Sequence, residues 1–168
     1  MKLSYWIYVI AVTTALTTAH AQPSEPRVFG DTKVQEVYRV VLDRGAPLLE
    51  TILDIIKRKN IQDGHVMLTA GSVEECTFHY VASTAQKPHD VTKTVKGPYE
   101  ILNGGGIIAD GVPHIHITLA SLGKPAVGGH LEKGCRVLYL AELTFLQYSG
   151  PALTRKPNAN GVSLLDAK

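Results

Sequence analysis

The strongest hydrophobic pattern in the chain predicts one helix that begins at Pro47 and ends near Asn60. Apolar residues recur there at steps of three and four positions, and charged residues fill the positions between them, as in a helix that buries one face. Pro47 suits the first turn of a helix, where its missing N–H removes no hydrogen bond. The apolar positions are Leu48, Leu49, Ile52, Leu53, Ile55 and Ile56.

Elsewhere the hydrophobic residues form short runs with a period of two, which predicts strands. Residues 34–42 form the first run. Five further runs, separated by clusters of Gly, Pro and Asp, cover residues 65–70, 77–82, 99–108, 114–121 and 135–146. One helix followed by consecutive strands predicts an α+β fold, in which a mainly antiparallel β-sheet is covered by one packed main helix. We expect this domain to span residues 34–148 and to be followed by a C-terminal tail over 149–168.

The first residues follow a different pattern, which is typical of a secretion signal. Lys2 precedes an apolar run over 3–12, and a small-residue Ala-x-Ala segment ends at Ala21. Threonines interrupt the apolar run after about a dozen residues, whereas a membrane-spanning helix needs about 20. We therefore expect residues 1–21 to be a signal peptide cleaved after Ala21 and residues 22–33 to be a flexible leader. The mature protein would then be periplasmic or secreted, with no membrane span.

The charge balance of the chain argues against a nucleic-acid partner. The sequence has 17 Lys and Arg residues and 15 Asp and Glu residues, and removal of the signal peptide takes away one Lys. The mature chain would carry a net charge of about +1, whereas affinity for DNA depends on many basic side chains that neutralise phosphates. We therefore do not expect the mature protein to bind DNA.

Two cysteines, Cys76 and Cys135, permit one disulfide in an exported protein. Each lies in a strand-like run beside apolar residues, where a free thiol can instead serve as a small buried hydrophobic group. Two separate thiols are the simpler interpretation, and the spacing alone does not decide between the two.

The candidate chemistry lies in the run that contains His114 and His116. Side chains on a strand alternate between its two faces, so both imidazoles share one face while Ile115 and Ile117 take the opposite, core-facing side. The two histidines are then about 6 to 7 Å apart along the strand, within reach of one metal ion. Two histidines at this spacing can also be ordinary surface or interface residues, so the metal hypothesis depends on a third ligand.

A third ligand is available in a Gly-Gly-His segment that ends at His130, after a turn. Three neutral imidazoles around an open fourth position would form a zinc-type site. A simple hairpin centred near Gly123-Lys124 would set His116 opposite Leu131, however, so His130 requires either a bulge at Gly128-Gly129 or a neighbouring subunit. The remaining histidines of the domain are interpreted as ordinary strand or loop residues: His65, His79 and His89.

These segments resemble the PPC domain, the plant and prokaryote conserved domain, in its prokaryotic form. The resemblance is carried by the His-x-His and Gly-Gly-His motifs over 113–119 and 127–131, by Gly-Cys-Arg-Val at 134–137, and by Ala-Glu-Leu at 141–143. Further matches extend it over nearly all of residues 34–165. The resemblance implies a compact sheet with a helix packed on it and assembly into homotrimers.

The same resemblance implies a metal bound by the family's histidines, which match His114, His116 and His130. Glu100 matches a glutamate of the family and would lie near that site without being a ligand. The family is often labelled DNA-binding, but its plant members contact DNA through an Arg-Gly-Arg hook outside the domain. This sequence contains no such hook.

The leading functional hypothesis is therefore an exported, trimeric, metal-containing binding or assembly module. It would hold zinc or another divalent transition metal and recognise an unidentified small-molecule or protein ligand. A metal-dependent hydrolase or lyase is the alternative from the enzyme class, because a metal with an open position can activate water; Glu100 is then the weak candidate for the catalytic base. A DNA-binding regulator is the third hypothesis, and the charge, the missing hook and the export signal disfavour it.

Overall fold

The computed structural model describes residues 25–168, which contain one helix and eight strands. The predicted signal peptide and its cleavage site lie outside these residues, and residues 25–32 carry neither helix nor strand. No helix in the described range is long and apolar enough to span a membrane. The elements are β1 (Lys33–Asp43), α1 (Leu48–Lys59), β2 (Asp63–Val81), β3 (Asp90–Ala109), β4 (Val112–Ala120), β5 (Val127–Leu131), β6 (Arg136–Ser149), β7 (Leu153–Pro157) and β8 (Ser163–Ala167).

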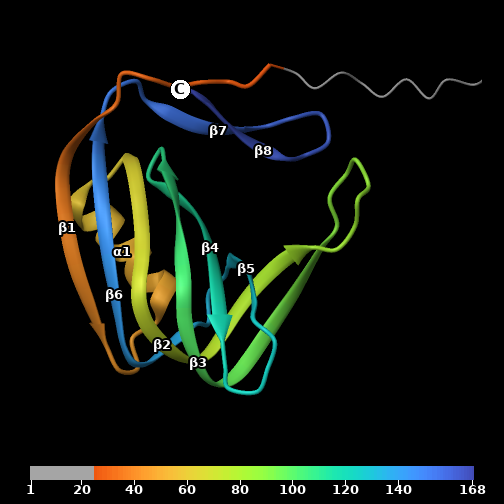
Figure 1. Ribbon diagram of the computed structural model, residues 1–168. Helices are drawn as coiled ribbons and strands as arrows, with labels where there is room; N and C mark the ends of the chain where they lie inside the picture. The colour runs from red at the N-terminus through yellow and green to blue at the C-terminus, as the bar shows by residue number, and fades with distance from the viewer. Residues whose placement is uncertain (1–24) are drawn as a thin grey trace, which may run out of the picture.

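Six of the strands form one antiparallel sheet in the order β1-β6-β2-β3-β4-β5 (Figure 1). The end strand β5 also pairs with β2, through Phe78 opposite Leu131 and His79 opposite His130. Strands β2, β3, β4 and β5 therefore close into a ring, while β1 and β6 continue the sheet beyond it. The mainly antiparallel sheet with one helix agrees with the predicted fold class.

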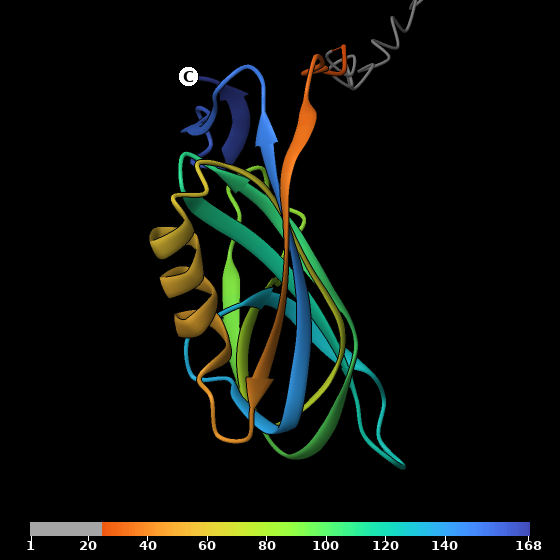
Figure 2. The same cartoon turned by 90° about the vertical axis from the view of Figure 1, so that its left-hand side faces the viewer.

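The helix α1 packs along one side of the sheet (Figure 2). Its buried side chains are Leu48, Ile52, Ile55 and Ile56, which come from the periodic positions of the sequence. Each fully buried side chain of this kind contributes about 1.5–3 kcal/mol through the hydrophobic effect. The helix ends where Asn60 adopts the left-handed conformation and donates its backbone N–H to the carbonyl oxygen of Lys57, as expected for a helix terminus.

Strand β2 differs from the sequence-based expectation. The predicted runs 65–70 and 77–82 belong to one long strand, and the residues between them continue it through bulges against β6 and β3. Gly71 lies in this irregular stretch with φ +148, close to the backbone of Leu140 and Ala141. Bulges break the period-two pattern and bend a strand without ending it, which is why the sequence reads as two strands.

The C-terminal tail forms a separate two-stranded hairpin, β7–β8, at one end of the sheet (Figure 1). The side-chain oxygen of Asn158 accepts hydrogen bonds from the backbone N–H groups of Asn160 and Val162, which fixes the turn between the two strands. This turn reaches the same hollow as the histidines described below.

The two cysteines are joined by a disulfide, so the simpler interpretation of two separate thiols is wrong. Cys76 and Cys135 are completely buried, at 0% and 1% exposure. The bond links β2 to the segment that leads into β6, and the two residues are 59 positions apart in the chain.

Candidate metal centre

The three histidines of the predicted site come together on the outer face of the ring. His114 and His116 lie on β4 with the buried Ile115 and Ile117 pointing to the opposite, core side, and His130 lies on the neighbouring strand β5. The Nε2 atoms of His114 and His116 are 3.2 Å apart. One ring nitrogen from each of the three histidines lies within 4.8 Å of the other two. Two nitrogens bound to one tetrahedral zinc ion are separated by about 3.3 Å, so these imidazoles fit a single ion after small side-chain rotations.

The hairpin register brings His130 to the site without a bulge. His116 pairs directly with His130, and Leu119 pairs with Val127, with no shift between them. The turn is centred on Gly123, whose φ of +70 suits a glycine, so the expected pairing of His116 with Leu131 is wrong by one residue. A bulge or a neighbouring subunit is therefore unnecessary, and one chain supplies all three imidazoles.

Glycines allow the strands of the site to lie close together. A Cβ atom on Gly128 would overlap the carbonyl oxygen of Ile117 on β4, and one on Gly129 would overlap the carbonyl oxygen of His79 on β2. These two residues precede His130 directly and allow β5 to lie between its two neighbours. His130 can therefore reach the site only because Gly128 and Gly129 have no side chains.

The structure adds a fourth histidine, His79, to His114, His116 and His130, and these four residues form the histidine cluster. No motif in the sequence singles out His79. It pairs with His130 across β2 and β5, and the two rings stack with their centroids 4.6 Å apart. The Nδ1 atom of His79 is 2.7 Å from a carboxylate oxygen of Glu132, and Asp90 lies 4.0 Å from its Nε2 atom. His79, His130 and Glu132 form a second group whose ligand atoms are within 4.8 Å of one another.

The environment of the cluster favours neutral imidazoles. Burial lowers the pKa of His114 to about 4, and the positive charge of Arg155 and the neighbouring histidines act in the same direction. Burial also lowers the pKa of His130, followed by the effect of His79, while Glu132 opposes the shift. A histidine binds a metal ion only in its neutral form, so both residues are ready ligands at neutral pH.

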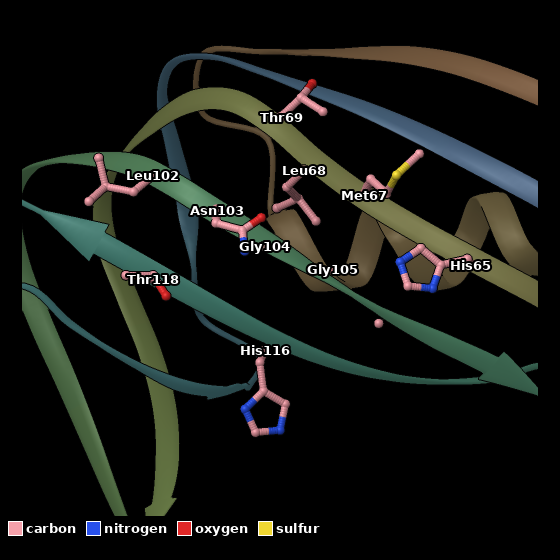
Figure 3. A pocket seen from close by; sticks show the side chains of 11 residues that line it. His65, Met67, Leu68, Thr69, Leu102, Asn103, Gly104, Gly105, His116 and Thr118 are labelled. Atoms are coloured by element: carbon pink, nitrogen blue, oxygen red, sulfur yellow. The ribbon is translucent and has the colours of Figure 1, made fainter.

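The cluster borders two hollows of the surface. One is a groove over β2, β3 and β4 whose lining includes Gly104 and Gly105; Figure 3 shows His116 and His65, which also line it, on opposite sides of Gly105. The other is lined by the histidines of the cluster and by residues 161–163 of the C-terminal hairpin. A ligand can therefore reach the histidines from solvent.

Glu100 is not part of the cluster. It lies on β3 opposite Ala120, four residues along β4 from His116, which corresponds to about 13 Å. It lines a different hollow, together with Leu122 and Tyr139. Among the described residues, neither group that could hold a metal includes Glu100.

The fold and the cluster together define an antiparallel-sheet domain with an imidazole-lined candidate metal site. The model of the Plants and Prokaryotes Conserved (PCC) domain matches residues 30–148, which include all the histidines of the cluster. The match covers well over half of the chain. The chain therefore belongs to this family, which is the PPC family that its motifs resemble.

Two solved structures illustrate the similarity. A metal-containing protein, AF0104 from Archaeoglobus fulgidus, has a TM-score of 0.72 and 27% identity, over 83% of this chain and 98% of its own. A candidate DNA-binding protein from Bacteroides thetaiotaomicron has a TM-score of 0.70 and 23% identity, over 80% of this chain and 94% of its own, and this second likeness concerns the fold alone.

A curated relative is much longer than this chain. The bifunctional protein GlmU from Synechococcus sp. (strain JA-2-3B'a(2-13)) is 26% identical over 139 residues, which is 82% of this chain and 21% of that protein. The chain thus spans about a fifth of this relative's length, and the activity of the relative is not carried over to it.

Proposed function

We propose that this chain is an exported, homotrimeric PPC-domain protein that binds zinc, or another divalent transition metal, through His114, His116 and His130. The open fourth position of the ion would bind a small-molecule or protein ligand. The observation that carries the proposal is the convergence of three ring nitrogens within 4.8 Å of one another, from residues of a single chain. When bound, the metal would supply a Lewis-acidic centre, while the chain holds its ligands neutral and leaves one side open.

The donor set agrees with this class of metal. Imidazole nitrogens suit zinc, copper and nickel, and the two cysteines are tied up in the disulfide, so the described residues offer no free thiolate for a softer ion. The similarity to the metal-containing protein of Archaeoglobus fulgidus supports a metal site in this chain.

The proposed export and the trimer have separate support. A buried disulfide is typical of proteins that fold in oxidising compartments, which favours the periplasm or the outside of the cell. The edge strand β1 exposes three valines, Val34, Val37 and Val41, at more than half of their surface, and a subunit interface would cover such residues.

Two measurements test export and assembly. N-terminal sequencing of exported protein should begin at Gln22, and an intact Met1 would contradict export. Light scattering should give the mass of three chains, and a monomer would contradict the trimer.

Elemental analysis tests the metal site directly. The purified mature protein should carry close to one metal ion per chain after incubation with zinc at neutral pH and dialysis. His116→Ala should remove this metal and leave the far-ultraviolet circular dichroism unchanged, because His116 is exposed and contributes little to the core. His89→Ala is the matched control, since His89 is also exposed but lies outside the cluster, and it should retain the metal. Wild-type protein that binds no zinc would refute the proposal.

The two alternatives receive less support. The hydrolase or lyase hypothesis relied on Glu100 as the catalytic base, and this residue lines a different hollow. The DNA-binding hypothesis would need a basic surface, whereas basic and acidic residues are nearly balanced in number. A salt-dependent DNA-binding assay with the mature protein should show no measurable affinity at physiological ionic strength.

A further inference from the structure

Arg155 on β7 is a cation without an anionic partner beside the histidine cluster. One of its terminal nitrogens donates a hydrogen bond of 3.4 Å to the carbonyl oxygen of Ser163, a residue that lines the same hollow as His114 and His130. Its Nε atom is buried and has no hydrogen-bond partner. None of the ion pairs found in residues 25–168 involves Arg155, so the guanidinium has unused donors at the edge of the hollow.

Arg155 lies near the histidines, since Ser163, which accepts its hydrogen bond, lines the hollow together with His114 and His130. A divalent ion on three neutral imidazoles would place two further positive charges next to this guanidinium. The two carboxylates beside the cluster, Glu132 and Asp90, both lie against His79, and neither forms an ion pair with Arg155. Partly buried positive charges require a compensating anion, because their separation from water is otherwise unfavourable.

The walls of the hollow indicate which anion fits. Besides the histidines, the hollow is lined by apolar side chains from the end of β2, the β2–β3 connection and the C-terminal turn, namely Val81, Pro88 and Val162. Asp90 also lines it, and its carboxylate lies on the His79 side, 4.0 Å from the Nε2 atom of that residue. An organic acid can place its carboxylate at the cationic end and its carbon chain against these residues. An inorganic phosphate would satisfy the charges but would leave the apolar wall without a contact.

We propose that the open position of the metal binds the carboxylate of a small organic acid, and that Arg155 donates hydrogen bonds to the same carboxylate. The guanidinium fork matches the two oxygens of a carboxylate, and its charge strengthens each hydrogen bond. This inference rests on the proposed metal site and adds the ligand class to it. Arg155 is a ligand-binding residue in this scheme and does not hold the metal.

The test uses the mature protein loaded with Co²⁺, whose visible absorption changes when its fourth ligand changes. Butyrate is the probe, and it should produce a saturable spectral change at neutral pH. Acetate should bind more weakly because its single methyl group makes little contact with the apolar wall. Inorganic phosphate should also bind more weakly, and neutral butyramide should not bind. Arg155→Gln should weaken butyrate binding by about 10- to 100-fold and leave the cobalt content at the wild-type level.

Two further variants control for folding and for general charge. Lys156→Gln removes the neighbouring cation, which already contacts Asp166 and the carbonyl oxygen of Ala167, and should change butyrate binding less than two-fold. Arg155→Lys keeps the charge but loses the fork of donors, and it should give an intermediate loss of butyrate affinity. This variant keeps the test decisive in case Arg155→Gln unfolds the hairpin.

The outcomes separate the two proposals. Three results with cobalt-loaded protein would overturn the carboxylate ligand and leave the metal site intact. They are no spectral change with butyrate, phosphate binding as tight as butyrate binding, and equal butyrate affinity in wild type and both Arg155 variants. Protein that binds no cobalt would remove the metal site itself, and the carboxylate proposal with it.

Discussion

The two halves of this sheet are organised by different kinds of information. In the half formed by β1, α1 and β6, local periodicity predicts each element, because α1 buries one face and the strands alternate, and β1 and β6, from opposite ends of the domain, pair along ten positions with one irregularity. In the ring of β2 to β5, the decisive features are non-local, namely the pairing of β5 with both β4 and β2 and the glycines that permit it. The histidine cluster lies in the second half, so the candidate site depends on the exact register between strands, while the helix and the first strand can be predicted from local pattern alone.

The largest expected effect comes from the helical half. Ile52 is fully buried on α1, so Ile52→Ala should lower the free energy of unfolding by about 2–5 kcal/mol through lost burial and a cavity. Zinc affinity should stay within two-fold of wild type, because no residue of α1 contributes to the cluster. Urea unfolding measures the stability, and a zinc titration of the folded variant measures the affinity. A variant that loses both in parallel would show that the two halves are not separable.

In the ring, a substitution should lower the zinc affinity as well as the stability. Gly128→Ala should push β5 away from β4, because the added Cβ overlaps the backbone of Ile117. We expect a loss of about 1–3 kcal/mol in stability, as for other overpacked sites, and a drop of about ten-fold or more in zinc affinity, as for substitutions that disturb ligand orientation.

Gly30→Ala is the control for this substitution, since nothing lies within 4 Å of the position that its Cβ would take. It should change stability by less than about 0.5 kcal/mol and leave zinc affinity unchanged. Equal zinc affinity in Gly128→Ala and wild type would mean that the cluster does not depend on the close approach of β5.

The same contrast explains what the sequence could and could not predict. The helix limits and the face of His114 and His116 follow from local periodicity, and both were predicted correctly. The His116–His130 register was missed by one residue because the centre of a six-residue connection is not defined by its composition. His79 was missed because its neighbour His130 is about fifty positions away, and only the closure of β5 onto β2 brings them together. The disulfide depends on a long-range approach of the same kind.

The last expected effect concerns protons and sharpens the comparison within the ring. The pKa of His114 is about 4 in the folded protein and near 6.5 in the unfolded chain, so the unfolded chain binds the proton first as the pH falls. The metal-free protein should therefore lose stability between pH 6.5 and pH 4, and this residue adds no further loss below pH 4. His130 acts in the same direction, since its pKa is also lowered. Urea unfolding in the presence of a chelator, at several pH values, should show a flatter profile for His114→Gln than for wild type or for His89→Gln. A His114→Gln profile as steep as that of wild type would show that the acid sensitivity arises outside the cluster.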